Sequence, residues 1–214
     1  MMLHPIECGN FKLDGGAMFG VVPKMLWQKT NPADKNNLVE VSSRSLLVET
    51  GNRLVLIDAG MGNKQSKKFF SYYNRWGDFS LEKSLKEKGF HRDEITDVFL
   101  THLHFDHCGG AIIKTRKGNL IPAFKNATYW SHKKHWEWAN NPNSREKASF
   151  LSENIRPIKE SGQLTLLEGD EFIMENSPLG FDVIVVNGHT EKQMLPLISY
   201  KTVSYTHLTL PTTD

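Results

Sequence analysis

The chain has 214 residues, 39% of them hydrophobic, and a formal net charge of +2 at pH 7. This length suits one domain with a sizeable core, and the longest aliphatic run, residues 54–57, is far too short to cross a membrane. The mean hydropathy of −0.43 fits a soluble globular protein, and the pI near 8.4 does not favour a nucleic-acid partner, which needs a concentrated basic surface.

The cysteines and the N-terminal segment bear on the compartment of the protein. The first residues do not combine a basic start, an apolar stretch and a small-residue cleavage site, so we expect no secretory signal. Cys8 and Cys108 permit one disulfide but do not make a disulfide framework. We therefore expect reduced thiols and a cytoplasmic location.

In chain order, the first predicted element is a glycine-rich turn over residues 14–20. It lacks the lysine and hydroxyl residues of a phosphate loop, so it does not indicate nucleotide binding. A β-hairpin follows. Residues 45–50 and 53–58 are rich in Val, Leu and Ile, and the Gly51-Asn52 pair between them favours a two-residue turn.

The rest of the chain alternates predicted helices and strands. Residues 80–88 predict a helix with Ser80 as its N-cap and Gly89 as its stop. Residues 95–101 predict a buried strand, whereas residues 125–161, rich in Trp, Lys, Glu and Asn, predict helix and loop. Three further strands are predicted at residues 171–175, 181–186 and 194–200. This order predicts one domain with a layered α/β fold.

A cluster of histidines and an aspartate directly follows the predicted strand 95–101. His102 and His104 are two residues apart, so in an extended backbone they point the same way and can share one ion. Asp106 and His107 lie just beyond, where two glycines allow the chain to turn. Imidazole nitrogen with carboxylate oxygen is the ligand set of zinc, and also of iron or manganese. A metal site is favoured over a histidine-rich surface loop.

Residues 102–107, His-Leu-His-Phe-Asp-His, resemble the His-x-His-x-Asp-His motif of the metallo-β-lactamase superfamily. Two further segments are similar to that family in the same order along the chain. Residues 56–60 resemble its early strand that ends in an aspartate-glycine turn, and residues 188–190, Gly-His-Thr, resemble its second histidine loop. The resemblance implies an αββα sandwich, of which the C-terminal part of the second half is expected to be missing.

The resemblance also implies the ligands of a dinuclear zinc site, with iron or manganese as alternatives. His102, His104 and His189 match the three-histidine metal site, and Asp106 and His107 match protein ligands of the second metal. Asp58 matches a position whose carboxylate orients a ligand, and a turn aspartate after a strand remains its equal alternative. The family also needs a bridging aspartate and a last histidine, which this sequence does not present in a family-like context.

The function that the resemblance implies is metal-dependent hydrolysis of a small-molecule ester, lactone or related substrate. A hydroxide activated by the metals attacks the substrate, and Asp106 passes a proton to the leaving group. The motif is similar to the lactonase and organophosphate-hydrolase branches. Three alternatives stay open: a glyoxalase-II-like thioesterase, an iron-using oxidoreductase, and a non-catalytic metal-binding fragment. We expect no nucleic-acid or membrane partner, and a homodimer remains open.

The end of the chain has a composition of its own. Residues from 203 onward resemble the translation of a sequencing-library adapter. We therefore expect a metallo-β-lactamase-like domain over residues 1–202 and a non-native tail over residues 203–214, with a divergent C-terminal strand as the alternative. On this interpretation His207 and Asp214 are not metal ligands.

Six other residues call for a choice between chemistry and packing. Cys108, beside two glycines, is expected to be a small packing residue rather than a ligand or nucleophile. His132 and His135 are spaced as a metal pair can be, but their lysine and glutamate neighbours favour a solvated helix face. Trp130, Trp136 and Trp138 either pack this helix onto the sandwich or line the mouth of a pocket.

Overall fold

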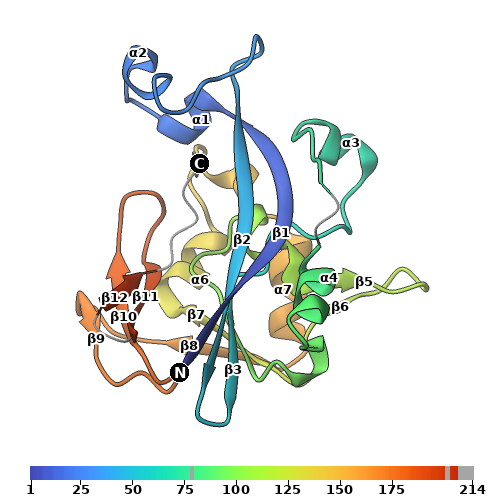
Figure 1. Cartoon of the computed structure of the whole chain (residues 1–214), viewed down its shortest axis with the longest axis vertical. Coiled ribbons are helices and arrows are strands. Elements are labelled where there is room, and N and C mark those ends of the chain that lie inside the picture. The colour runs from blue at the N-terminus through green and yellow to red at the C-terminus, as the bar shows by residue number, and fades with distance from the viewer. Residues whose placement is uncertain (78–79, 201–202, 207–214) are drawn as a thin grey trace.

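Two β-sheets face each other in the computed structural model, and helices cover the outer face of the larger sheet (Figure 1). The structure describes residues 1–77, 80–200 and 203–206, the last four as backbone alone. Within these residues, no helix has the length and apolar character that crossing a bilayer requires. The layered α/β arrangement predicted from the sequence is confirmed.

The larger sheet carries the segments that form the candidate site. Its strand order is β1 (Met2–Asp14), β2 (Leu38–Thr50), β3 (Arg53–Ile57), β4 (Asp97–Phe99), β7 (Thr128–His132) and β8 (Leu164–Leu167). The first three strands are antiparallel, whereas β3, β4, β7 and β8 run parallel. Parallel strands bring their carboxyl ends to one edge of the sheet, so the segments after β3 and β4 emerge side by side.

The smaller sheet is antiparallel throughout. Its order is β12 (Val203–Thr206), β11 (Gln193–Tyr200), β10 (Asp182–Val186) and β9 (Ile173–Met174). A separate two-stranded sheet consists of β5 (Ile112–Lys114) and β6 (Leu120–Pro122). Because β12 pairs with β11, the first four residues of the segment expected to be a tail form a strand. Residues 207–214, with His207 and Asp214, lie outside the described residues, and the predicted boundary stays a prediction.

The helices are short. They are α1 (Gly15–Phe19), α2 (Lys24–Trp27), α3 (Lys67–Ser71), α4 (Leu81–Glu87), α5 (Phe105–Cys108), α6 (Lys133–Asn140) and α7 (Ser152–Glu160), with 3₁₀ turns η1 (Arg92–Glu94), η2 (Gly109–Ala111) and η3 (Lys147–Ser149). The helix predicted near residues 80–88 is confirmed as α4, where the Ser80 side chain accepts a hydrogen bond from the N–H of Lys83. The glycine-rich residues 14–20, expected as a turn, instead contain α1, which the Asp14 carboxylate caps.

Neighbouring residues of the central strands point into two different cores. On β3, Leu56 packs beneath the helices, while Val55 and Ile57 face the smaller sheet. The strands β2, β4 and β7 divide their side chains in the same way. Because both faces of the sheet are covered, its strands are continuous apolar runs rather than alternating ones. This double burial holds the strand ends, and the loops that follow them, in place.

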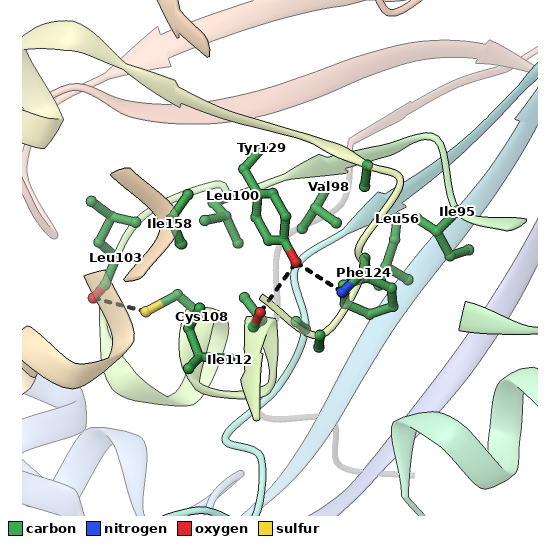
Figure 2. Close-up of a cluster of buried hydrophobic side chains, with 14 of the residues drawn as sticks. Leu56, Ile95, Val98, Leu100, Leu103, Cys108, Ile112, Phe124, Tyr129 and Ile158 are labelled. Carbon is green, nitrogen blue, oxygen red and sulfur yellow. Dashed lines mark hydrogen bonds between the residues drawn. The ribbon is translucent and has the colours of Figure 1, made fainter. Parts of the chain in front are cut away.

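The core on the helical face includes Leu100 and Leu103 from the segment that follows β4 (Figure 2). The Tyr129 hydroxyl of β7 accepts a hydrogen bond from the N–H of Phe124 and donates one to the carbonyl of Ala111. The fully buried Cys108 thiol lies 3.3 Å from the carbonyl oxygen of Leu103. The expectation that Cys108 is a packing residue is confirmed, since its side chain lies within this core.

The structure also contains strands that the sequence reasoning did not predict. The hairpin of β2 and β3 and the strands β10 and β11 are confirmed. However, β7 lies inside the segment expected to be helix and loop, and β1 and β8 were not predicted. β7 and β8 are only five and four residues long, so the pattern of apolar residues in each is too short to be recognised beside charged residues. Their pairing in the parallel sheet makes them strands.

Candidate metal centre

Three chain segments meet at the carboxyl edge of the larger sheet. Asp58 follows β3, residues 101–107 follow β4, and His189 lies in the turn between β10 and β11. Backbone hydrogen bonds join the segments: the N–H of Ala59 donates to the carbonyl of His107 at 2.8 Å, and the N–H of Met194 donates to that of Thr101 at 2.9 Å. The candidate ligands are thus tied to both sheets.

His102, His104 and His189 form one compact group. One ring nitrogen from each lies within 4.8 Å of the others, and His104 Nδ1 is 3.1 Å from His189 Nε2. Ring nitrogens that share a tetrahedral zinc ion lie about 3.4 Å apart, given zinc–nitrogen bonds of about 2.1 Å. His102 and His104 are buried, whereas His189 is exposed. The group therefore fits one such ion and opens to solvent on the side of His189.

The protonation of these three rings suits metal binding, which requires neutral imidazole. Burial, reinforced by the neighbouring histidines, lowers the pKa of His104 to about 3 and holds that of His102 well below its usual value. Burial also lowers the pKa of His189. The Nε2 of His102 is buried without a hydrogen-bond partner, so a lone pair on this atom would be available to a cation.

Asp58 determines which nitrogen of His102 carries the proton. Both Asp58 oxygens are acceptors, so the Thr101 hydroxyl donates its only hydrogen to them, with contacts of 2.8 and 3.0 Å. The same hydroxyl lies 3.0 Å from His102 Nδ1 and can only accept there. His102 is therefore protonated on Nδ1, and its Nε2 lone pair points into the three-histidine group.

Asp58 orients His107 directly. Its Oδ2 accepts a hydrogen bond of 2.8 Å from His107 Nδ1, and His107 Nε2 lies 3.6 Å from Asp106 Oδ2. Burial alone would lower the pKa of His107, but the carboxylates of Asp106 and Asp58 outweigh it and raise this pKa to about 9. His107 and Asp106 thus lie together as a second pair of candidate ligands. The rings of His107 and His102 are 4.0 Å apart.

The sequence that carries this site matches a known family. Residues 38–192 match the family model of the metallo-beta-lactamase superfamily. The chain belongs to this superfamily. The expected αββα-type fold and the expected class of metal-dependent hydrolase are confirmed at this level. No sequence among curated proteins matches the chain significantly.

Solved structures of several hydrolases resemble the chain over most of its length. A probable metal-dependent hydrolase from Staphylococcus aureus is 30% identical, with a TM-score of 0.82, over 96% of this chain and 71% of that one. AidC, a dizinc quorum-quenching lactonase, is 19% identical with a TM-score of 0.69, over 95% of this chain and 69% of its own. The hydrolase AbOPH is 22% identical with a TM-score of 0.70, over 95% and 68%.

Within this superfamily fold, two glycines let the metal-site loop lie against the loop after β3. A Cβ atom at Gly110 would overlap the carbonyl oxygen of Ala59, and one at Gly109 would overlap that of Met61. The N–H of Gly110 donates to the carbonyl of Gly60 at 2.8 Å. The glycines expected to let the chain turn therefore serve mainly to permit close backbone contact.

The prediction of a solvated helix face for His132 and His135 was wrong, because each is only 1% exposed. His135 Nε2 accepts a hydrogen bond of 2.9 Å from the N–H of Leu103, so its Nδ1 donates to the carbonyl of Glu191. This ring thus bridges the two histidine loops. His132 caps α6 and bonds the carbonyl of Gly169. Their burial depends on which side of α6 packs against the sheet, and the sequence pattern did not indicate that side.

Sequence reasoning also missed Thr101 and Glu146, which have no motif around them. Glu146 is 6% exposed and lies 3.8 Å from His104 Nε2. Of the three tryptophans, Trp130 and Trp136 are buried in the cores, and Trp138 packs against one and donates a hydrogen bond to Glu146. These tryptophans pack α6 and β7 onto the sandwich.

Proposed function

We propose that this protein is a dinuclear zinc hydrolase of small esters or lactones. The observation that carries the proposal is the group of three neutral histidines at the open edge of the sandwich, with Asp106 and His107 beside it. His102, His104 and His189 would hold one ion, and Asp106 and His107 would contribute to the second. Bound zinc supplies an activated water at neutral pH and polarises the carbonyl group of the substrate.

The protein residues have separate tasks in this proposal. Asp58 orients His102, through Thr101, and His107, so that their Nε2 atoms would be the ones to bind the ions. The carboxylate of Asp106 is less buried than the histidines next to it in the chain. It is therefore the group best placed to pass a proton to the leaving oxygen while it holds the second ion.

Aromatic side chains pack beside Asp106, and we propose that the partly buried Phe69 and Tyr73 would contact an apolar substituent of the substrate. Phe105 precedes Asp106 in the chain, and its ring lies 4.8 Å from that of Tyr73 and 5.5 Å from that of Phe69. Burial, with the charge of Asp106, raises the pKa of the Tyr73 hydroxyl, which places this ring in the field of the candidate ligand. Apolar walls with a few convergent polar groups are typical of small-molecule sites.

The test is hydrolysis by the purified zinc-loaded protein of an acyl lactone, an aryl ester, a thioester and a phosphotriester, with metal content measured on the same sample. We expect close to two zinc ions per chain and turnover of the lactone or the ester. Exclusive turnover of the thioester would favour the thioesterase, and iron in protein from its native source would favour the oxidoreductase. A metal-loaded protein that hydrolyses none of the panel would overturn the proposal.

A matched pair of variants tests the ligands. His102→Ala should abolish turnover and lower the bound metal, because it removes one of three donors to one ion. His91→Asn is the control: His91 is an exposed N-cap of η1, and asparagine caps equally well. Equal loss of metal in both variants would argue against the three-histidine site.

We also propose that the protein works in a reducing compartment such as the cytoplasm, and as a homodimer. Both cysteines are free thiols, which fits such a compartment.

The proposed homodimer rests on the segment between β1 and β2, which exposes large apolar side chains. Val21 is fully exposed and Met25 is 74% exposed, and contact with a second copy would cover them. Light scattering coupled to size exclusion tests this state, and a monomer at micromolar concentration would refute it.

A further inference from the structure

The single ring proton of neutral His104 can lie on either of two nitrogens, and the two have different surroundings. Its Nδ1 faces His189 Nε2 at 3.1 Å, whereas its Nε2 is buried with no hydrogen-bond partner. A neutral imidazole carries one hydrogen, on one nitrogen or the other. Which tautomer forms decides whether Nδ1 offers a lone pair to the three-histidine group.

Among the residues that the structure describes, the carboxylate that faces this Nε2 is that of Glu146. Its Oε2 lies 3.8 Å away, and both side chains are more than nine-tenths buried. At this distance the contact is electrostatic rather than a full hydrogen bond. A buried carboxylate nevertheless favours an N–H that points toward it over a lone pair that does so, and this preference is strong where the local dielectric constant is low.

Glu146 is itself held firmly, and it reaches the second histidine loop. Its Oε2 accepts hydrogen bonds from the Thr190 hydroxyl at 2.7 Å and from Trp138 Nε1 at 3.1 Å, and its Oε1 accepts one from Arg145. Burial raises the pKa of Glu146, but these donors outweigh it, so the pKa is lowered overall. Thr190 directly follows His189, so one carboxylate contacts both histidine loops.

We propose that Glu146 is a positioning residue of the metal site: it holds His104 in the tautomer protonated on Nε2, which leaves Nδ1 free as the ligand atom, and anchors the His189 loop through Thr190. Asp58 does the same for His102, through Thr101, and for His107, so each histidine within residues 102–107 has a carboxylate that sets its proton. The proposal rests on the proposed function only in assigning the use of Nδ1 to metal binding.

The variant that tests this is Glu146→Gln. The amide oxygen of glutamine can keep the hydrogen bonds from Thr190 and Trp138, while the charge that faces His104 is lost. Glu137→Gln, an exposed carboxylate on α6, is the matched control. Thermal unfolding of the metal-free proteins shows whether each variant is folded.

The first readout needs no metal. Long-range ¹H–¹⁵N spectra of the metal-free protein report the tautomer of His104. We expect Nε2–H in the wild type and in Glu137→Gln, and a mixed or reversed tautomer in folded Glu146→Gln. An unchanged tautomer in folded Glu146→Gln would overturn the proposal. If Glu146→Gln does not fold, Nδ1–H in the wild type would overturn it and Nε2–H would support it.

The second readout is metal affinity. Competition of zinc with a chromophoric chelator should show tenfold to hundredfold weaker binding in Glu146→Gln, the range typical of residues that orient ligands, with no change in Glu137→Gln. Cobalt-substituted protein should show an altered visible spectrum, because the geometry at one histidine changes. Equal affinity and equal spectra would overturn the role in metal binding. A wild type that binds no metal would overturn the proposed function, while the tautomer would still test Glu146.

Discussion

Replacement of Asp58 by asparagine isolates the contribution of one buried carboxylate to the candidate site. The residue has a φ of 57°, in the left-handed region that asparagine tolerates as well as aspartate, so the backbone should not be strained. The amide keeps one acceptor oxygen and replaces the other with a donor. If the oxygen stays with the N–H of Thr101, the amide nitrogen faces the Nδ1–H of His107, donor against donor.

The size of the effect follows from the bond that is lost. Asp58 is 2% exposed, so solvent does not replace the missing acceptor. A hydrogen bond to a charged group contributes about 1.5–3 kcal/mol, and about 1.4 kcal/mol corresponds to tenfold in affinity. We expect zinc binding that depends on His107 to weaken about tenfold to hundredfold, with a smaller change at the three-histidine group, where the Thr101 relay can persist.

The assay is zinc titration against two chelators of different affinity, which separates the tighter ion from the weaker one. Asp170→Asn serves as control, because this carboxylate is exposed and forms ion pairs with Lys134 and Lys192, away from the candidate ligands. If both zinc affinities of Asp58→Asn lie within about twofold of the wild type, the reasoning is refuted. Loss of even about 1.4 kcal/mol would weaken binding tenfold. Equal weakening in the control would show a general charge effect.

Three further outcomes are expected. Gly110→Ala should destabilise the fold by about 1–3 kcal/mol in denaturant unfolding, because a Cβ would overlap the Ala59 carbonyl; unchanged stability would refute the close contact. Burial raises the pKa of the fully buried Cys108 to about 12, so roughly 1 in 10⁴ of this thiol is ionised at pH 8, and a disulfide reagent should react with it only after unfolding. Rapid reaction of Cys108 in the folded protein would contradict this. Removal of metal with a chelator should abolish hydrolysis and lower the melting temperature, and both should return with zinc; a melting temperature that does not move would argue against a bound ion.

The sequence by itself determined the parts of the site that depend on local geometry. His102 and His104 project from one short loop after an apolar strand, and Asp106 and His107 follow within it, so their proximity needs no knowledge of the fold. The same holds for the hairpin of β2 and β3, where the Gly51-Asn52 turn and the flanking apolar runs agree.

Only the tertiary structure decided which residues hold the ligands in place. His135 reads as a surface residue among lysines, yet the packing of α6 buries it between the two histidine loops. Glu146 lies in a loop with no pattern, and its position beside His104 and Thr190 depends on contacts between segments far apart in the chain. A ligand motif is local in the sequence. Each histidine of this motif, however, has a second ring nitrogen that is buried and needs a polar partner. Residues far apart in the chain supply these partners, so only the folded structure identifies them.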